Sequence, residues 1–441
     1  MTIFSLILVL YLSYLSINIK NEENFFIKII TLYFIFSIFI NIGYFVRINE
    51  YLVNYFDVIF IYMTLMSYVF FGNKIRIGKK LLLLILFFIT SIFLGVFLLV
   101  FFPPNFKIVS TYIGVAEIIR VYPQLNFVVV KRFILIILFL LFIIIFKSVI
   151  DNNKWKKINN NLISFSKFYI IFCYFELVSK NIFNSNKLII LSSDIFGINV
   201  SQHVNLFERS GNYALQGLTR EPSQLAIAIF VSIYILLLSD RKDSEKIFYL
   251  ILGSFLLFMS GSASGFMVIF ILIITFFLVT TKPKKIIIYG ALAFGLILFL
   301  INYVDFSYYL LRINRVLGGK EFRFITIVDN FQVFLKRPMF GIGIGTTESY
   351  GFVSSALSNI GLVAFLLWGY IIFYGTKIFN LRHLIILLMV VGFFVTRGSI
   401  QGLYSGIILI FVYTPHYFFA KEDCNHNHIE INAQVESISK N

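Results

Sequence analysis

The chain is dominated by apolar stretches about 20 residues long, which recur along almost all of its 441 residues. A helix of that length crosses the hydrocarbon core of a bilayer, which is roughly 30 Å thick. Hydrophobic residues make up 59% of the sequence and charged residues 13%, which excludes a water-soluble domain of this size. The stretches lack the alternating polarity of a membrane β-barrel. The sequence therefore predicts an all-α polytopic membrane protein.

We expect about 12 to 13 transmembrane helices, because polar or basic residues separate the apolar segments and some segments are short. Residues 1–420 are predicted to form one transmembrane domain, and residues 421–441 a disordered polar tail in the cytoplasm. The predicted spans lie at residues 2–17, 25–46, 51–71, 81–102, 131–150, 163–183, 222–238, 246–260, 264–281, 286–304, 355–375, 383–396 and 400–419.

Basic residues predict how these helices are oriented, since cytoplasmic loops carry an excess of Lys and Arg. The basic segments agree with a single alternating topology, which accounts for most of the net charge of +16. This topology places residues 103–130, 184–221 and 305–354 on the extracytoplasmic side. The N-terminus lies outside if residues 2–17 span the membrane, and inside if they do not. The residues predicted as cytoplasmic are Lys74, Arg76, Lys79, Lys80, Lys147, Lys154, Lys156, Lys157, Lys167, Arg241, Lys242, Lys246, Lys282, Lys284, Lys285, Lys377 and Arg382.

The extracytoplasmic segments carry basic residues that the topology does not require. Guanidinium groups bind phosphate oxygens through paired hydrogen bonds, so the arginines among them suit a phosphorylated ligand. The alternative is that they form structural ion pairs with nearby carboxylates. For Glu117 and Arg120, which are three residues apart, we expect a local salt bridge. The candidates in the other two segments are His203, Arg209, Arg220, Arg312, Arg315, Lys320, Arg323, Lys336 and Arg337.

One polar stretch, Gly217–Ser223 (GLTREPS), stands directly before an apolar run. Pro is tolerated in the first turn of a helix, so Pro222 is expected to begin a span that ends near Leu238. Arg220 and Glu221 then lie at a helix N-terminus, where free N–H groups and the helix dipole favour an anion. The alternative is that these two side chains neutralise each other as an ion pair at the membrane boundary.

Residues 322–337 have apolar positions at helical spacing but are too polar to span a bilayer. We expect an amphipathic helix at the outer interface, with Arg323, Thr326 and Asn330 turned toward a cavity. The opposite stripe would be buried in lipid or protein. Its residues are Phe324, Val328, Phe331 and Leu335.

This helix is predicted to end at Pro338, which precedes glycines alternating with isoleucines in Gly341–Gly345. The run allows close backbone packing or a sharp turn. Together with the Gly217–Ser223 stretch and Arg323, it resembles the O-antigen polymerase and O-antigen ligase superfamily, whose members are multi-span transferases of the GT-C type. The resemblance implies a sugar repeat joined by pyrophosphate to a polyprenyl lipid such as undecaprenol. Such substrates serve lipopolysaccharide or capsule synthesis on the outer face of the bacterial inner membrane.

Ligases of this superfamily carry a His-Asn pair after the glycine run, whereas this chain has no His there. The resemblance therefore favours a polymerase and makes Glu348 the candidate base, with Glu221 and His203 as alternatives. His203 is also a candidate contact for the glycan. The resemblance further implies that Arg323 binds the pyrophosphate, together with Arg220 or Arg209. Additional candidates are Arg312, Arg315 and Arg397, of which Arg397 is otherwise an ordinary interfacial residue.

We expect glycosyl transfer without a metal or another cofactor, since the sequence has no Asp-x-Asp pair for a cation on a nucleotide sugar. The expected partners are the bilayer, the lipid-linked oligosaccharide and a chain-length regulator protein, and no motif supports nucleic-acid binding. The alternatives are a flippase or other transporter for lipid-linked glycans, an O-antigen ligase, and an acyltransferase that uses His203. A transporter would show internal repeats and charged groups within discontinuous spans.

Overall fold

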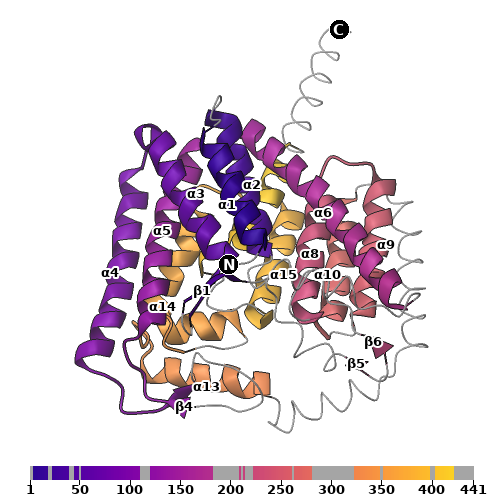
Figure 1. Ribbon diagram of the computed structural model, residues 1–441. Coiled ribbons are helices and arrows are strands. Elements are labelled where there is room, and N and C mark those ends of the chain that lie inside the picture. The colour runs from indigo at the N-terminus through magenta and orange to yellow at the C-terminus, as the bar shows by residue number, and fades with distance from the viewer. Residues whose placement is uncertain are drawn as a thin grey trace, which may run out of the picture.

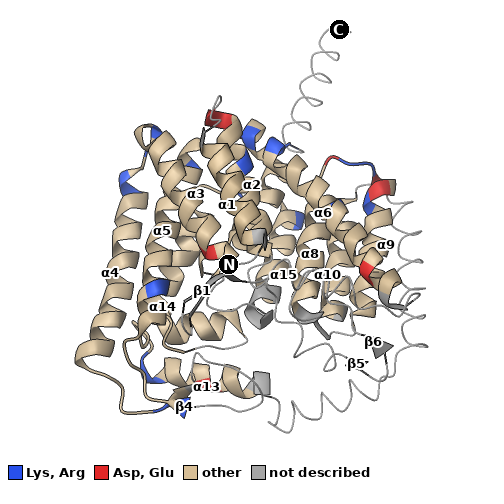
Figure 2. Cartoon of the chain, viewed as in Figure 1, with Lys and Arg blue, Asp and Glu red and all other residues tan. Residues whose placement is uncertain are grey.

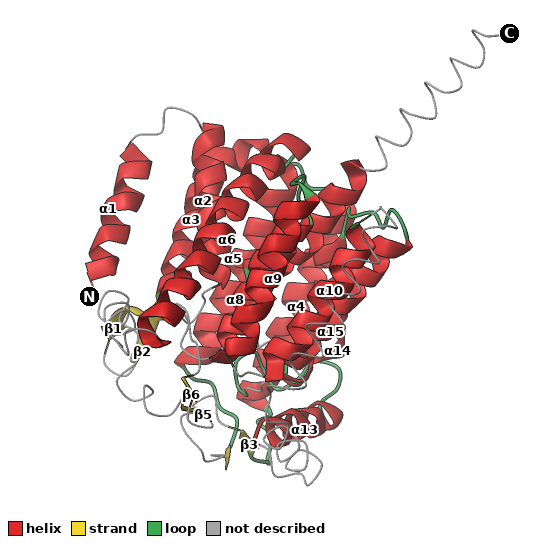
Figure 3. Ribbon diagram, turned by 90° about the vertical axis from the view of Figure 1, so that its right-hand side faces the viewer, coloured by secondary structure: helices red, strands yellow, loops and turns green. Residues whose placement is uncertain are grey.

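The structure of the protein, a computed structural model, is a bundle of helices with short strands and the helix α13 at one end (Figures 1 and 3). The helices of the bundle run side by side in both views. The structure describes residues 3–17, 22–38, 44–48, 51–109, 120–181, 208–209, 212–213, 222–260, 263–280, 322–347, 351–397 and 403–421.

The first half of the chain supplies most of the long helices. Its elements are α1 (Ile3–Ile17), α2 (Glu22–Ile38), β1 (Tyr44–Ile48), β2 (Tyr51–Asn54), α3 (Tyr55–Phe71), the 3-10 turn η1 (Gly72–Lys74), α4 (Lys79–Phe101), β3 (Ile108–Val109), β4 (Arg120–Val121), α5 (Phe127–Val149) and α6 (Asn152–Asn181). The second half contributes β5 (Glu208–Arg209), β6 (Asn212–Tyr213), α8 (Pro222–Leu237), α9 (Asp243–Met259), α10 (Ala263–Val279), α13 (Phe322–Lys336), α14 (Phe352–Phe373), α15 (Leu381–Arg397) and a last helix at Gly406–Lys421.

The described part of the chain has five helices that are long and apolar enough to cross a membrane, which supports the prediction of a membrane protein. They are Tyr55–Lys74, Lys79–Phe101, Phe127–Val149, Asn152–Ser179 and Phe352–Phe373. Shorter apolar helices lie at Ser5–Ser16, Gln224–Leu237, Met267–Val279, Leu381–Gly392 and Gly406–Lys421. The predicted span at 286–304 and the tail beyond Lys421 lie outside the described residues.

The described part of the chain is mostly helical, as predicted, and three pairs of short antiparallel strands accompany the helices. The most extensive pair joins β1 and β2, with Ile48 opposite Tyr51. It shortens the span predicted at 25–46, because α2 ends at Ile38 and β1 takes up the end of that segment. Tyr, Phe, Val and Ile fit a strand as well as an apolar helix, so composition did not separate the two.

Helix α6 is longer than predicted, with 30 residues in place of a span beginning at residue 163. Asp151 caps its start, because Asp151 Oδ1 accepts a hydrogen bond of 2.8 Å from the backbone N–H of Lys154. The lysines assigned to a loop therefore lie on the helix, where Lys167 pairs with Glu245 of α9. Lys246 is likewise buried in α9, with its Nζ 5.4 Å from the ring centre of Phe418.

The core of the bundle is aromatic and surrounds Tyr33 of α2. Its ring centre lies 5.3 Å from that of Phe60 on α3 and 5.1 Å from that of Phe142 on α5. The fully buried Tyr33 hydroxyl donates a hydrogen bond of 2.9 Å to the carbonyl of Tyr404, which ties α2 to the end of the chain. Packed aromatic pairs stabilise by about 0.5–1.5 kcal/mol each, beyond the contribution of the area that they bury.

Helix α8 is buried around its whole circumference, which explains why it is apolar on every face.

The described part of the basic segments predicted as cytoplasmic gathers at one end of the bundle (Figure 2). Hydrogen bonds join these segments, since Lys147 donates to the carbonyl of Tyr374 and Lys421 pairs with Asp240. The strands β3 to β6 and α13 lie at the opposite end (Figures 1 and 3). The described parts of the predicted cytoplasmic segments therefore lie at one end of the bundle, and the described parts of the predicted extracytoplasmic segments lie at the other.

Candidate functional site

The segment Pro338–Gly345, which contains the glycine run, folds against a break in α14. The break lies at Gly361 of α14, which has φ 74° and ψ 176°, so the span predicted as continuous at 355–375 is interrupted. This region of φ and ψ is essentially restricted to glycine. A break leaves backbone N–H and C=O groups without helical partners, and inside a bilayer such groups must be satisfied by protein.

Residues 338–347, which we call the glycine turn, satisfy these groups on both sides of the break. Before the break, the carbonyl of Ser358 accepts a hydrogen bond of 3.0 Å from the N–H of Ile342. After it, the N–H of Leu362 donates to the carbonyl of Pro338 at 2.8 Å. Two parallel bonds, Gly343 N–H to Asn359 and Val363 N–H to Met339, complete the contact. The break and the turn therefore form one backbone-paired unit.

The glycines of this unit confirm the prediction of close packing and sharp turns. Gly341, Gly343 and Gly345 all have positive φ. A Cβ on Gly341 would lie 2.5 Å from the carbonyl oxygen of Asn359, and one on Gly95 of α4 would lie 2.5 Å from that of Phe340. Backbone therefore packs directly on backbone where the turn enters the bundle between α4 and α14.

Asn359 is the centre of a buried polar network that holds the end of the turn. Its Nδ2 donates to the carbonyls of Ser355 at 2.6 Å and Thr347 at 2.9 Å. Its Oδ1 accepts a bond of 3.3 Å from the N–H of Thr347. A fully buried amide whose donors and acceptor are all engaged fixes a single conformation of its surroundings.

The prediction that Thr326 and Asn330 of α13 face a cavity is wrong. Both are fully buried, and Asn330 Oδ1 accepts a hydrogen bond of 2.6 Å from Ser358 of α14. In the apolar stripe, Leu335 is 73% exposed and points away from the protein. In a bilayer this exposed part of α13 would face lipid, while its polar residues bond to the serine-rich start of α14.

Three cations on or beside α13 bind to protein groups at this end of the bundle. Arg120 of β4 pairs with Asp329 of α13 at 2.7 Å, whereas the partner expected for it, Glu117, lies outside the described residues. Lys336 lies 4.5 Å from the ring centre of Phe106. Arg337 donates a hydrogen bond of 2.5 Å to the carbonyl of Phe102, and partial burial lowers the pKa of its guanidinium. These contacts hold the loop after α4 against α13 and the residues that follow it.

Arg132, near the start of the span predicted at 131–150, is a cation of α5 that is only 6% exposed. Helix α5 begins before the predicted span, at Phe127. The Oδ1 atom of Asn126 caps that start by accepting a hydrogen bond of 3.1 Å from Val129. The Asn cap was a visible signal for the earlier start, and with it the pattern would have placed Arg132 in the second turn.

The side chains of the predicted site lie outside the part of the chain that the structure describes. For three of these residues only the backbone is described: Arg323 lies in the first turn of α13, Arg209 pairs with Asn212 in the β5–β6 ladder, and Arg397 ends α15. The others, Glu348, Glu221, Arg220, Arg312, Arg315 and His203, are outside the described residues altogether. The elements next to them are placed, since Thr347 precedes Glu348 and the start of α8 follows Glu221. Pro222 begins α8 as predicted.

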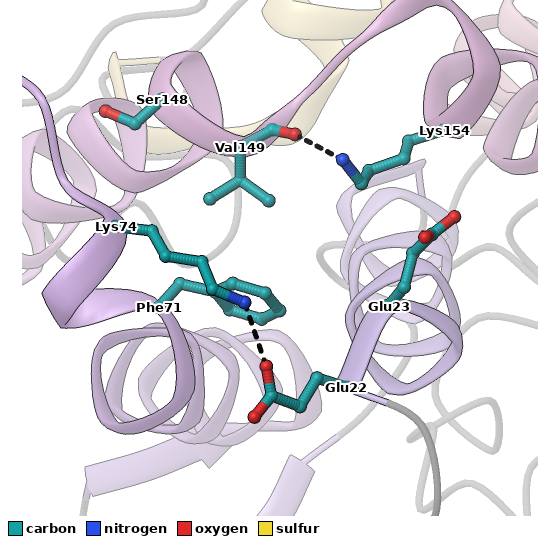
Figure 4. Close-up of a pocket in the computed structure, with 7 residues that line it drawn as sticks. All are labelled: Glu22, Glu23, Phe71, Lys74, Ser148, Val149 and Lys154. Carbon is teal, nitrogen blue, oxygen red and sulfur yellow. Dashed lines mark hydrogen bonds and ion pairs between the residues drawn. The ribbon is translucent and has the colours of Figure 1, made fainter.

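A cavity of about 510 Å³ lies at the other end of the bundle (Figure 4). It is lined by Glu22, Glu23, Phe71, Lys74, Ser148, Val149 and Lys154. Lys74 pairs with Glu22 at 3.0 Å, and Glu23 pairs with Lys157 at 2.9 Å. All four of these side chains are about half exposed, so the pairs are weak surface links between helices. The cavity is lined by none of the residues predicted to bind substrate or to act in catalysis.

Comparison of the chain with protein-family models, curated proteins and solved structures finds no match. The likeness to the O-antigen polymerase and ligase superfamily thus rests on the two motifs and on the hydropathy profile. Among the described residues, no group of three or more His, Cys, Asp or Glu side chains is arranged to hold a metal ion.

Proposed function

We propose that the protein is a polysaccharide polymerase of the bacterial cytoplasmic membrane, with its site facing the periplasm or cell exterior. It would transfer a growing glycan from polyprenyl pyrophosphate to a lipid-linked repeat unit. The observation that carries this proposal is that the motif from Arg323 to Gly345 folds as one unit with the break in α14. Helix α13, the glycine turn and the α14 break are joined by backbone and side-chain hydrogen bonds at the end of the bundle opposite the basic loops.

The charge at this end favours an anionic substrate. Six cations with described side chains lie on β3, β4, α5 and α13 or next to these elements. Two carboxylates lie near them, one on α13 and one in the first turn of α3. A local excess of positive charge attracts a diphosphate and raises its local concentration. The cations are Lys107, Arg120, Lys131, Arg132, Lys336 and Arg337, and the carboxylates are Asp57 and Asp329.

In the proposed reaction, Arg323 binds the donor pyrophosphate with Arg220 or Arg209. These guanidinium groups neutralise the charge that grows on the pyrophosphate oxygen as its bond to the anomeric carbon breaks. The acceptor hydroxyl forms the new bond to that carbon and gives its proton to Glu348, or to Glu221 or His203. The products are the lengthened lipid-linked glycan and the released polyprenyl pyrophosphate. No metal takes part in this scheme.

Elongation by purified protein tests the proposal. Wild type in lipid nanodiscs, supplied only with lipid-linked repeats, should produce longer glycans on a gel. Arg323→Ala should abolish elongation while the protein remains folded and monodisperse. Arg76→Ala, which removes an exposed arginine at the opposite end, is the charge-matched control and should keep normal chain lengths. Near-normal elongation by Arg323→Ala would remove the central assignment, and Glu348→Gln tests the base separately.

A transporter for lipid-linked glycans is the second candidate, and the α14 break is the observation that favours it. Secondary transporters often bind substrate where a helix is discontinuous. Here, however, the backbone groups around Gly361 bond to the glycine turn, which leaves fewer of them for a ligand. Movement of lipid-linked repeats across liposomes without new glycosidic bonds would favour the transporter over the polymerase.

A further inference from the structure

Arg132 is a buried charge within a predicted span that the proposed reaction does not yet use. A charged side chain at membrane depth is costly and is retained where it has a function. The neighbouring Lys131 has a local explanation, because its Nζ lies 2.5 Å from Asp57 Oδ2 of α3. The adjacent position of a helix points about 100° away. Arg132 lies beside the glycine turn, with its Cδ close to Gly345.

The last glycine of the turn makes room for this arginine. A Cβ on Gly345 would lie 2.8 Å from Arg132 Cδ and 3.3 Å from the carbonyl oxygen of Val128, so any other residue would displace the arginine or the turn. Gly345 also has φ 82°, which other residues rarely adopt. The close contact and the positive φ together require glycine opposite Arg132.

The turn beyond Gly345 is held in one place. Thr346 and Thr347 are buried, Thr346 Oγ1 donates to the carbonyl of Gly343 at 2.8 Å, and Thr347 is bonded to Asn359. The next residue in the sequence is Glu348, the proposed base. A rigid turn thus connects the position of Arg132 to the beginning of the segment in which the chemistry is proposed.

We propose that Arg132 binds a phosphate group of the lipid-linked substrate from within the membrane domain, and that Gly345 gives it the space to do so. This inference rests on the proposed function and adds a residue that neither motif contains. A guanidinium has five N–H donors, so it can bind two phosphate oxygens and also keep contacts to protein. The ligand class is a polyprenyl phosphate or pyrophosphate.

Direct binding of a fluorescent polyprenyl pyrophosphate to the full chain in nanodiscs tests this inference. Arg132→Gln should weaken binding at least about tenfold, and Gly345→Ala should weaken it similarly by displacing the arginine. Arg132→Lys keeps the charge without the paired donors and should fall between wild type and Arg132→Gln. Arg76→Gln is the control and should bind normally, because Arg76 is exposed at the opposite end of the bundle.

The outcomes separate this inference from the proposed function. Absence of binding by wild type would overturn both, whereas equal binding by wild type and Arg132→Gln would overturn only the role of Arg132. If inorganic pyrophosphate displaces the probe, the result supports recognition of the phosphate groups. If polyprenyl alcohol displaces the probe and pyrophosphate does not, the inference is wrong. If Arg132→Lys and Gly345→Ala both fail to fold, Arg132 is a structural residue and the inference is wrong.

Discussion

Replacing Gly361 by alanine tests whether the break in α14 is required by the fold. The new Cβ would lie 2.3 Å from the carbonyl oxygen of Met339 and 2.6 Å from the backbone nitrogen of Gly341. Both contacts are with backbone, so no side-chain rotation relieves them. Alanine would also have to adopt φ 74° and ψ 176°, which is unfavourable for any residue with a Cβ.

The magnitude follows from these two effects. A residue held in that region of φ and ψ costs about 1–3 kcal/mol, and overpacking of a tight contact costs about 1–3 kcal/mol. Because one backbone shift relieves part of both, we expect Gly361→Ala to lower the free energy of unfolding by about 2–5 kcal/mol. The hydrogen bonds of Pro338 and Met339 across the break should weaken with it.

The matched control is Gly369→Ala in the same helix, where a Cβ would meet nothing within 4 Å. Alanine favours a helix over glycine by about 0.5–1 kcal/mol, so this variant should be as stable as wild type or slightly more stable. Unfolding free energies can be measured by titrating SDS into detergent micelles and following the fluorescence of the two tryptophans, Trp155 and Trp368, which are both buried. Unfolding of Gly361→Ala at the same SDS fraction as Gly369→Ala would refute the reasoning.

Three other variants test the structure elsewhere. Asn359→Ala should lose about 2–4 kcal/mol of unfolding free energy in the same titration, because it leaves the backbone groups of Thr347 unsatisfied in a buried site; stability equal to wild type would contradict the network. Lys147→Met should cost about 1.5–3 kcal/mol, since the ammonium donates to three carbonyls at the end of α14, whereas Met at the exposed Lys156 should change nothing measurable. Asp151→Ala removes the cap of α6 and should cost about 1 kcal/mol at pH 7. Burial raises the pKa of Asp151, but the hydrogen bonds and charge of Lys154 outweigh this effect and lower the pKa from its ordinary value of 3.8. The stabilisation by the Asp151 cap is therefore present above pH 3.8 and is lost as the pH falls further. A difference between wild type and Asp151→Ala that persists in stronger acid would contradict this.

The sequence determined the features of this protein that depend on local properties of the chain. Membrane character follows from apolar stretches of sufficient length, the start of α8 from Pro222, the end of α13 before Pro338, and the tight turn from its glycines. Each depends on hydropathy or on allowed backbone angles within a few residues. The candidate pyrophosphate arginines came from the motifs in the same way and stay predictions.

Only the tertiary structure decided which distant segments meet. Arg120 bonds to Asp329, a carboxylate 209 residues away in the chain. The break at Gly361 exists because the glycine turn supplies the hydrogen bonds that the helix loses, and Arg132 is buried because Gly345 leaves space beside α5. No local pattern encodes these choices, since each polar group takes its partner from whichever segment packing brings within hydrogen-bond distance.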